Sequence, residues 1–514
     1  MERSNLIKLL ISTIIFLIVW LLPTTAFGVE GLTVIEQRVI AIFVLAAVLW
    51  SMEPIPIWGT SVVIMVMMLL TTSDSMLSFF NDNLSIQEIA RKLGISESSE
   101  ALTKEAVTNA MKGYTFYDGV KTPILGAKSI MASFADPTVM LFMGGFVLAI
   151  AATKYKLDAT LARTILKPFG KRPKFVMLGF LVVTALLSMF MSNTATAAMM
   201  IAILTPVLAS MPESDNAGRV GLALSIPVAA NIGGIGSPIG TPPNVVAVGN
   251  LAKEGIDISF GNWMMIMVPV AMIILFLAWL FLNRKFPCKQ ESIEIKIDGE
   301  VDKSPKAKIV YVTFAVTILL WVFGKELLGV NANTVAMIPF AVFCITGVFE
   351  KKDLAKIDWD VLWLVAGGFA LGVGLDAKIG PDGLTMSKHI VGAIPFDSWP
   401  TLAIILGSGV LCIVMSTFMS NSATAALLIP IFVALGKGMS DQLEPYGGVV
   451  TLIVGLALSA SFAMSLPIST PPNAIAYSKG FIKQKDMVLV GVVVGVISLV
   501  ISYTVLFFMG GLLK

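Results

Sequence analysis

The sequence predicts an all-α integral membrane fold with about 11 transmembrane helices and two re-entrant helical hairpins, arranged as an inverted repeat. Three observations predict it. Of the 514 residues, 56% are hydrophobic and 13% are charged, and the mean hydropathy is +0.87. The small, polar octet MSNTATAA at 191–198 recurs as MSNSATAA at 419–426. Each octet is followed by the tetrapeptide TPPN. Such a composition is typical of a chain whose solvent is the lipid bilayer.

Apolar segments long enough to enter a membrane occur along most of the chain. The first, residues 5–22, follows Arg3 and Lys8 as the apolar part of a secretory signal would. We interpret it as a retained span, because its apolar run is long and no small-x-small cleavage site follows it. The later segments lie near 38–51, 56–72, 137–153, 175–210, 218–247, 260–283, 309–325, 332–349, 361–375, 399–436, 447–476 and 486–511.

Two of these segments, 175–210 and 399–436, are too long for a single crossing. A span needs about 20 residues, so each segment is either two full helices or a hairpin that enters and leaves on the same side. Each has one polar octet at its centre. Non-helical backbone at membrane depth is tolerated only where it lines a cavity or is buried in protein. The octets therefore favour re-entrant hairpins.

The basic residues predict the orientation of the chain. Residues 154–174 contain seven Lys or Arg against one Asp, and the loops at 284–308 and 350–356 are also basic. An excess of Lys and Arg marks cytoplasmic loops. We therefore expect a multi-pass protein of the plasma or inner membrane. Its N-terminus is expected to be cytoplasmic and Lys514, after eleven crossings, extracytoplasmic.

The two halves of the chain repeat the same motifs in the same order. Forty-nine residues separate Ser192 from Thr241, and fifty separate Ser420 from Thr470. Earlier in each half the tripeptide GGF recurs, starting at Gly144 and Gly367, where we interpret it as a site of close helix packing. An odd number of crossings between the copies would give the halves opposite orientations. Inverted repeats of this kind are the usual plan of secondary transporters.

The repeated motifs are rich in oxygen and neutral. Proline has no N–H and clashes with a continuing helix, so TPPN should break the segments 218–247 and 447–476 near mid-membrane. Exposed carbonyls with Ser, Thr and Asn oxygens suit a hard cation such as Na⁺, whereas helix N-termini at Asn193 and Asn421 suit an anion. Neither motif contains a charged residue, so charge balance must come from a bound ion or from the substrate. The break residues are Thr241, Pro242, Pro243 and Asn244, and Thr470, Pro471, Pro472 and Asn473.

The paired motifs resemble those of the divalent anion:sodium symporters, a family that carries dicarboxylates, citrate or sulfate. Its signature is a Ser-Asn-Thr motif at the tip of each of two re-entrant hairpins, each followed by a proline-broken helix. The matching tips here are Ser192-Asn193-Thr194 and Ser420-Asn421-Ser422, and the resemblance covers most of the chain. Ser422 departs from the family pattern by losing the methyl group of threonine, which leaves the preferred substrate size open.

The resemblance implies two Na⁺ sites and a substrate site. The first Na⁺ site would use Ser188, Ser192, Asn193 and the region of Gly236. The second would use Ser416, Ser420, Asn421 and the region of Ser465. The substrate would contact Asn193, Thr194, Asn421, Ser422, Ser237 and Pro467.

The resemblance also implies a division of labour between parts of the chain. Residues 1–174 and 309–397 would form a scaffold that mediates a homodimer, and residues 175–283 and 398–514 a transport part that moves as a rigid body. The linker 284–308 would be cytoplasmic. The function implied is Na⁺-coupled symport of divalent anions, C4 dicarboxylates such as succinate above all, by an elevator mechanism.

Residues 73–133 form a polar insert that does not fit the repeat. Its stretch LSIQEIARKLGIS, at 84–96, has spacing similar to the first part of a DNA-binding helix-turn-helix. No clear basic recognition helix follows, and the orientation above places the insert outside the cytoplasm. We interpret the stretch as an amphipathic surface helix and expect no nucleic-acid partner.

Other functional classes are weighed by the residues that they would need. An enzyme requires acid, base, nucleophile or metal groups in its pocket, whereas the acidic residues here fall near segment ends. The cysteines are widely spaced, and His389 is the only histidine, so no metal cluster is indicated. A dicarboxylate or citrate exchanger not driven by Na⁺, or a sulfate transporter of the same fold, stays an open alternative.

Overall fold

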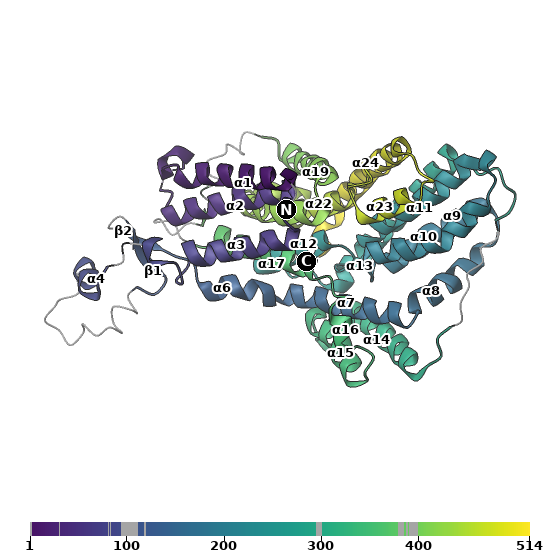
Figure 1. Ribbon diagram of the computed structural model, residues 1–514, viewed down its shortest axis with the longest axis horizontal. Helices are drawn as coiled ribbons and strands as arrows, with labels where there is room; N and C mark the ends of the chain where they lie inside the picture. Colours follow the sequence, from purple (N-terminus) through teal and green to yellow (C-terminus); the bar gives the residue numbers. More distant parts are fainter. Residues whose placement is uncertain are drawn as a thin grey trace. The chain divides into compact units, whose positions relative to one another are not determined.

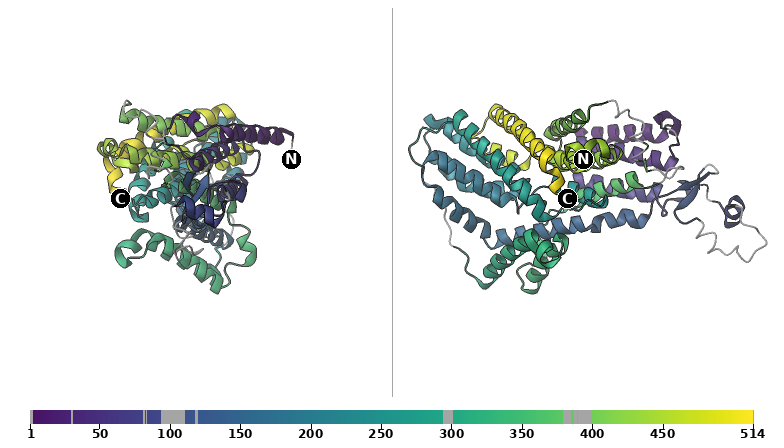
Figure 2. Two further views of the ribbon diagram at one scale, coloured as in Figure 1. Left: turned by 90° about the vertical axis from the view of Figure 1, so that its left-hand side faces the viewer. Right: turned by 180° about the vertical axis from the view of Figure 1, so that it is seen from behind.

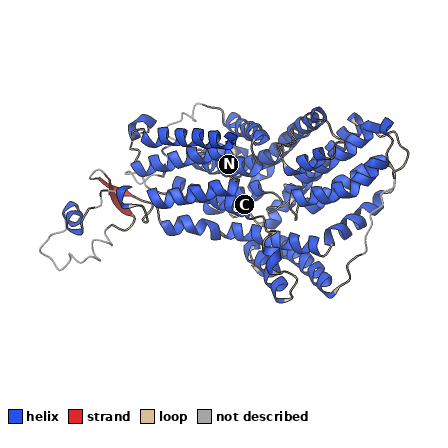
Figure 3. Ribbon diagram, viewed as in Figure 1, coloured by secondary structure: helices blue, strands red, loops and turns tan. Residues whose placement is uncertain are grey.

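A computed structural model gives the fold (Figure 1). It describes residues 3–29, 31–80, 82, 84–93, 111–117, 120–293, 301–378, 385–386, 389 and 399–513. Helices dominate these residues, and the two short strands belong to one antiparallel hairpin (Figure 3). The chain divides into two compact units. Unit 1 comprises Met1–Ala135 and Ala366–Trp399, and unit 2 comprises Asp136–Val365 and Pro400–Lys514.

Unit 1 is built on three consecutive apolar helices. These are α1 (Arg3–Leu21), α2 (Val34–Met52) and α3 (Ile57–Thr72), of which α2 packs against both others. A capping box starts α2, because Thr33 accepts from the Glu36 backbone N–H and the Glu36 side chain accepts from that of Thr33. Further short elements of unit 1 are η1 (Thr24–Phe27), η2 (Ser78–Phe80), α4 (Ile86–Lys92), β1 (Tyr114–Tyr117), β2 (Val120–Pro123), α6 (Ala127–Ala132) and η3 (Ser133–Ala135).

The polar insert contains a β-hairpin, which the prediction of an all-α fold did not include. Strands β1 and β2 pair antiparallel, with Tyr114 opposite Pro123. The sequence YTFY-DG-VKTP has the β-branched and aromatic residues and the Asp-Gly dipeptide that predict a hairpin. The expected surface helix exists as α4, which a capping box of Ser85 and Glu88 begins. Residues 94–96 of that stretch lie outside the described residues.

Unit 2 contains most of the first repeat. In chain order its helices are α7 (Pro137–Lys154), α8 (Leu157–Leu166), η4 (Lys167–Phe169), α9 (Pro173–Ser188), α10 (Asn193–Ser210), η5 (Glu213–Asp215), α11 (Asn216–Gly234), α12 (Pro242–Lys253) and α13 (Phe260–Lys285). Helix α11 packs against α9, α10 and α13 (Figure 2). Proline occupies the first turn of α7, α9 and α12, where its missing N–H costs no hydrogen bond.

The second repeat follows the same order. Its helices are α14 (Pro305–Leu328), α15 (Ala332–Ile345), α16 (Lys351–Leu354), α17 (Trp359–Asp376), α19 (Thr401–Phe418), α20 (Asn421–Gly438), α21 (Ser440–Leu443), η7 (Glu444–Tyr446), α22 (Gly448–Ser461), α23 (Pro471–Ser478), α24 (Gln484–Met509) and η8 (Gly510–Leu513). Helix α22 packs against α19, α20 and α24, as α11 packs against their counterparts. The repeat seen in the motifs is therefore a repeat of whole elements.

The helix inventory is that of a multi-pass membrane protein. Among the described residues, 10 helices are long and apolar enough to cross a membrane, or up to 11 if the bent pair Ser440–Tyr446 and Gly448–Ser461 is one span. This agrees with the predicted fold. Helices α10, α19 and α20 meet the same length criterion, whereas α9 is shorter. The re-entrant course of the two hairpins and the sidedness of the loops therefore stay predictions, and Lys514 lies outside the described residues.

Elements of the two halves are packed into one another. A Cβ on Gly144 of α7 would lie 2.7 Å from Cβ of Ala336 in α15, and one on Gly367 of α17 would lie 2.9 Å from Cα of Ser61. Both GGF motifs therefore mark close helix packing, as predicted. Helix α10 packs against α23, and α20 packs against α12. The ion pair between Lys437 and Glu254, 2.5 Å apart, joins the C-terminal ends of α20 and α12.

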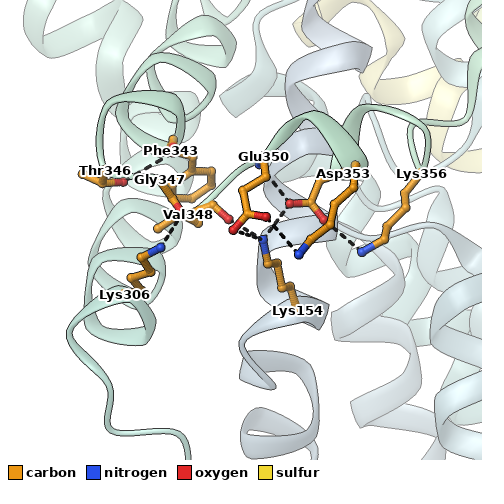
Figure 4. A network of polar contacts seen from close by, with 10 residues as sticks. Lys154, Lys306, Phe343, Thr346, Gly347, Val348, Glu350, Asp353 and Lys356 are labelled. Atoms are coloured by element: carbon orange, nitrogen blue, oxygen red, sulfur yellow. Dashed lines mark hydrogen bonds and ion pairs between the residues drawn. The ribbon is translucent and has the colours of Figure 1, made fainter.

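A buried carboxylate fixes the end of α7. The Asp353 side chain is fully buried and lies 2.6 Å from Nζ of Lys154 and 2.9 Å from Nζ of Lys356. Lys154 also donates to the Val348 carbonyl at 2.8 Å. Figure 4 shows Lys154 directed toward both Asp353 and Glu350. Burial by itself would raise the pKa of Asp353, but the hydrogen bonds from the two lysines and the backbone hold it well below its usual value.

The predicted scaffold and transport segments do not coincide with the two units. Both hairpins and both broken helices lie in unit 2, together with α7, α14 and α15 from the predicted scaffold segments. Of the predicted scaffold residues, 136–174 and 309–365 lie in unit 2, and 1–135 and 366–397 lie in unit 1. Which parts move during function stays a prediction, as does the homodimer.

Candidate functional site

Each octet forms the tip of a helical hairpin. Helix α9 ends at Ser188 and α10 begins at Asn193, and α19 ends at Phe418 and α20 begins at Asn421. The residue before each asparagine has non-helical backbone, with ψ of 130° at Ser192 and 143° at Ser420. Ser420 caps its helix by accepting from the Ala423 N–H at 3.1 Å, whereas Ser192 makes no such bond. The first N–H groups of α10 and α20 therefore point out of the tips.

Oxygen atoms converge at the first tip. The buried Ser188 hydroxyl lies 2.5 Å from the Asn193 amide and donates to the Ala230 carbonyl at 2.8 Å. The amide atom that faces Ser188 is also 3.1 Å from the Gly240 carbonyl oxygen and 3.3 Å from that of Ala230. We call Ser188, Asn193, Ala230 and Gly240 the first cluster.

Two arrangements satisfy the first cluster. With the Asn193 nitrogen inward, the amide donates to both carbonyls. With the oxygen inward, three acceptors and one hydroxyl face one another, an arrangement that a bound cation would stabilise. Neutral oxygen ligands of this kind suit a hard cation such as Na⁺. The first cluster is thus able to hold either its own hydrogen bonds or a cation.

The second tip repeats this geometry. The buried Ser416 hydroxyl lies 2.8 Å from the Asn421 amide oxygen and 2.9 Å from the Ala460 carbonyl oxygen, and its single O–H can donate to either of them. We call Ser416, Asn421 and Ala460 the second cluster. The serine four residues before each tip serine therefore contacts the tip asparagine in both halves, and the assignment of these residues to Na⁺ sites stays a prediction. A packing role alone would not require the same polar contacts twice.

The TPPN motifs break two helices, as predicted. Helix α11 ends at Gly234 and α12 starts at Pro242, and α22 ends at Ser461 and α23 starts at Pro471. The last asparagine of each motif replaces the missing backbone bonds. Asn244 donates to the carbonyls of Gly234 and Ser237, at 3.2 and 2.9 Å. In the second half, Asn473 donates to the carbonyl of Met464 at 2.7 Å and that of Leu466 at 2.9 Å.

Glycine makes room for the first cluster beside its break. A Cβ on Gly234 would lie 2.9 Å from both amide atoms of Asn193. In the region of Gly236, the residues next to Asn193 are Gly234 and Gly240. Gly236 itself lies against the Met189 side chain. Sequence reasoning missed the carbonyls of Ala230, Gly240 and Ala460, because any residue type can supply a carbonyl.

The remaining predicted residues connect the breaks to the tips or lie at the surface. Ser237 is buried and donates to the Met189 carbonyl at the first tip. In the second half a different position makes a similar contact: Ser469, which aligns with Gly240, donates to the Thr417 carbonyl at 2.9 Å. Thr194 is exposed, and the residues half-buried are Ser192, Asn193, Ser420, Asn421, Ser422, Ser465 and Pro467. Half-exposed hydroxyls and amides at the tips can meet an anion from solvent.

The octets and the TPPN motifs are uncharged. No charged residue occurs in either octet or in either TPPN motif. Among the described residues, no group of three or more His, Cys, Asp or Glu could hold a metal ion. The lone histidine instead lies within unit 1, where Nδ1 of His389 is 2.9 Å from a carboxylate oxygen of Glu36.

Comparison with solved structures supports the fold. The Alcanivorax borkumensis YdaH transporter superposes with a TM-score of 0.52 at 12% identity, covering 92% of this chain and 98% of that one. Neisseria gonorrhoeae MtrF superposes with a TM-score of 0.51 at 11% identity, covering 90% of this chain and 96% of that one. At these identities the likeness concerns the fold alone. Both are transporters built of membrane helices, as expected for the helix inventory above.

Sequence comparison is more specific. A sodium-dependent high-affinity dicarboxylate transporter of Caenorhabditis elegans is 31% identical, with 73% of this chain and 74% of that protein covered. The sodium-dependent dicarboxylate transporter SdcS of Staphylococcus saprophyticus is also 31% identical, with 75% of this chain and 79% of that protein covered. The family model described as the sodium:sulfate symporter transmembrane region matches residues 3–513. The chain therefore belongs to the sodium:sulfate symporter family, whose members are transporters and not enzymes.

Proposed function

We propose that this protein is a Na⁺-coupled symporter of divalent anions, with C4 dicarboxylates such as succinate as its best substrates. The observation that carries the proposal is a contact found in both halves. A buried serine lies beside a tip asparagine and beside a backbone carbonyl of the helix that ends at the break. The residues are Ser188, Asn193 and Ala230 in the first half, and Ser416, Asn421 and Ala460 in the second. Each cluster offers neutral oxygens to one cation. Two bound Na⁺ ions would offset the two charges of a dicarboxylate.

The substrate would be bound between dipoles and ions. In this proposal the carboxylates would be bound by the N-terminal N–H groups of α10 and α20, apart from the capped Ala423 N–H, and by the side chains of Thr194 and Ser422. Ser237 and Pro467 would shape the same site from the breaks. The names of the two curated relatives favour a dicarboxylate, whereas the family name includes sulfate.

We further propose an elevator-type mechanism in a homodimer of the plasma or inner membrane. Both hairpins and both broken helices belong to one compact unit, which supports their movement as a body. In this view each hairpin is re-entrant, the N-terminus is cytoplasmic and the C-terminus is extracytoplasmic.

One experiment tests both the class and the substrate. Purified protein in proteoliposomes is given labelled succinate, citrate or sulfate, with an inward gradient of Na⁺ or of K⁺ as the control. Symport predicts accumulation of succinate only with the Na⁺ gradient. Counterflow that is equal in both salts would instead identify an exchanger, and preferential uptake of citrate or sulfate would correct the substrate.

A further inference from the structure

One buried side chain connects the two halves at their helix breaks. Asn231 lies in the last turn of α11 and is 2% exposed. Its Nδ2 donates to Oγ1 of Thr470 at 3.2 Å and to Oδ1 of Asn473 at 3.3 Å. Both acceptors are buried residues of the second TPPN motif. A residue of the first half therefore completes the hydrogen bonds of the break in the second half.

The backbone of the same residue adjoins the first cluster. The peptide group between Ala230 and Asn231 supplies the carbonyl that accepts from Ser188 at 2.8 Å and lies 3.3 Å from the Asn193 amide atom. A cation that drew this carbonyl inward would tilt the peptide group to which Asn231 is attached. The tilt would change the distances from Nδ2 to its two acceptors, whose optimum is narrow.

On the far side, the network sets the shape of the second break. Thr470 caps α23 by accepting from the Asn473 N–H at 3.3 Å. Asn473 in turn holds the carbonyls of Met464 and Leu466, which flank Ser465. Ser465 is the residue that the family resemblance assigns to the second Na⁺ site. The path from the first cluster to this region contains only bonded or hydrogen-bonded groups.

The connection exists in one direction only. In the second half the residue after the cluster carbonyl of Ala460 is Ser461, whose hydroxyl donates to Ala457 in its own helix at 3.1 Å. The first break correspondingly lacks a cross-half donor, since the buried Oδ1 of Asn244 has no hydrogen-bond partner among the described residues. Asn231 has no duplicate, so its removal should not be compensated by symmetry.

We propose that Asn231 is a positioning residue that couples the two cation clusters, so that occupation of the first favours occupation of the second. This inference rests on the proposed function, in which both clusters bind Na⁺. When occupation of one Na⁺ site raises the affinity of the other, binding is cooperative. This positive coupling raises the Hill coefficient for Na⁺. Neither a packing role nor a direct ligand role of Asn231 predicts this change.

The test measures uptake of the best-transported anion against external Na⁺ concentration in proteoliposomes. We expect a Hill coefficient above 1 for the unmodified protein and a lower value, that of two independent sites, for Asn231→Ala, with half-saturating Na⁺ raised several-fold and uptake at saturating Na⁺ largely retained. Ser461→Ala is the matched control, and it should keep the Hill coefficient of the unmodified protein.

Two further variants guard against misfolding. Asn231→Ser introduces the residue found at the matching place in the second half, and Thr470→Val removes an acceptor from the other end of the bond while keeping its size. Each should lower the Hill coefficient as Asn231→Ala does. Combining Thr470→Val with Asn231→Ala should lower it no further, because both changes break the same connection.

Two results would overturn the inference in distinguishable ways. Na⁺-driven uptake with the original Hill coefficient in Asn231→Ala and Thr470→Val would remove the coupling role and leave symport intact. Uptake by the unmodified protein that is indifferent to Na⁺ would overturn the proposed function and the coupling with it. A Hill coefficient of about 1 in the unmodified protein would also refute coupling.

Discussion

At the scale of single residues, the tip asparagines have the largest expected effect. Asn193 and Asn421 each contact a cluster serine and begin a helix, so in the proposed site each would touch both a cation and an anion. Replacing either by alanine should abolish Na⁺-driven uptake of labelled succinate. Asn250→Ala is the control, because Asn250 is also buried but donates only within its own helix, to Val246 at 2.8 Å. Wild-type uptake by a tip variant would exclude the cluster that contains the replaced asparagine as an ion site.

The cluster serines should have a milder effect. Ser188→Ala and Ser416→Ala each remove one hydroxyl oxygen, and a lost polar contact weakens binding by about 1–2 kcal/mol, or roughly 5- to 30-fold. Half-saturating Na⁺ should rise by that factor, with uptake recovering at saturating Na⁺. Ser225→Ala provides a comparison, since the buried Ser225 hydroxyl donates only to Leu222 of its own helix. A Na⁺ dependence that stays unchanged in both serine variants would argue against hydroxyl ligands.

The sequence predicts side-chain ligands better than their backbone partners. Ser188 and Asn193 could be identified because serine and asparagine recur at matched spacing, and capping chemistry is local. The carbonyls of Ala230 and Gly240 have no such signal in the sequence. The Asn231 bond to Thr470 joins residues 239 positions apart, so it depends on tertiary packing that no local pattern specifies.

At the scale of elements, the TPPN motifs predicted that two helices are broken but not how many residues each break contains. The prolines of TPPN correctly predicted where α12 and α23 begin. Helix α11 nevertheless ends earlier, at Gly234, because the intervening residues are rich in glycine and include Pro238. The β-hairpin of the insert was missed for a different reason. The Asp-Gly dipeptide that indicates a hairpin was present. The two strands are only four residues long, however, so their pattern does not stand out within a polar, charged insert.

The contact between α7 and the α15–α16 loop predicts a pH-dependent stability effect. Lys154→Met leaves the buried Asp353 carboxylate with one lysine fewer, which should cost about 1–3 kcal/mol of unfolding free energy near neutral pH. The folded state lowers the pKa of Asp353, so this stabilisation is present above the unfolded-state value of about 4 and is lost as pH falls below it. The melting temperatures of variant and parent should therefore converge in acid.

The neighbouring pair Lys352 and Glu350 supplies the control for this measurement. Its atoms are 2.9 Å apart, but both side chains are exposed. Exposed ion pairs contribute little to stability, so Lys352→Met should leave the melting temperature almost unchanged at every pH. Equal shifts for Lys154→Met and Lys352→Met would show that burial of Asp353 does not decide the effect.

At the scale of the whole molecule, the two halves are joined through their functional elements. Helices α10 and α23 pack together, as do α20 and α12, so each hairpin lies against the broken helix of the other half. Elements of both halves must therefore be folded before either cluster is supported by its full surroundings. Because each hairpin packs against the broken helix of the other half, the fold needs both copies of the motifs. Finding both copies in the sequence therefore predicts this fold better than finding one.

The predicted orientation is tested by cysteine labelling. In a variant with Cys288, Cys344 and Cys412 replaced, Glu300→Cys should react with a membrane-impermeant reagent only from the cytoplasmic side, because residue 300 lies in the predicted cytoplasmic linker. Reaction only from the outside would invert the predicted topology.

Charge balance at mid-membrane leads to the last prediction. A dicarboxylate has about two negative charges near neutral pH, and burying them without compensation would cost at least several kcal/mol. The octets and TPPN motifs contain no cationic side chain, so the proposed mechanism assigns the compensation to Na⁺. Raising Na⁺ should therefore lower the apparent Kd for succinate, and raising succinate should lower that for Na⁺ by the same factor. Titrations at constant ionic strength, with choline replacing Na⁺, measure both. Succinate binding that is indifferent to Na⁺ would contradict symport and leave the exchanger as the better account.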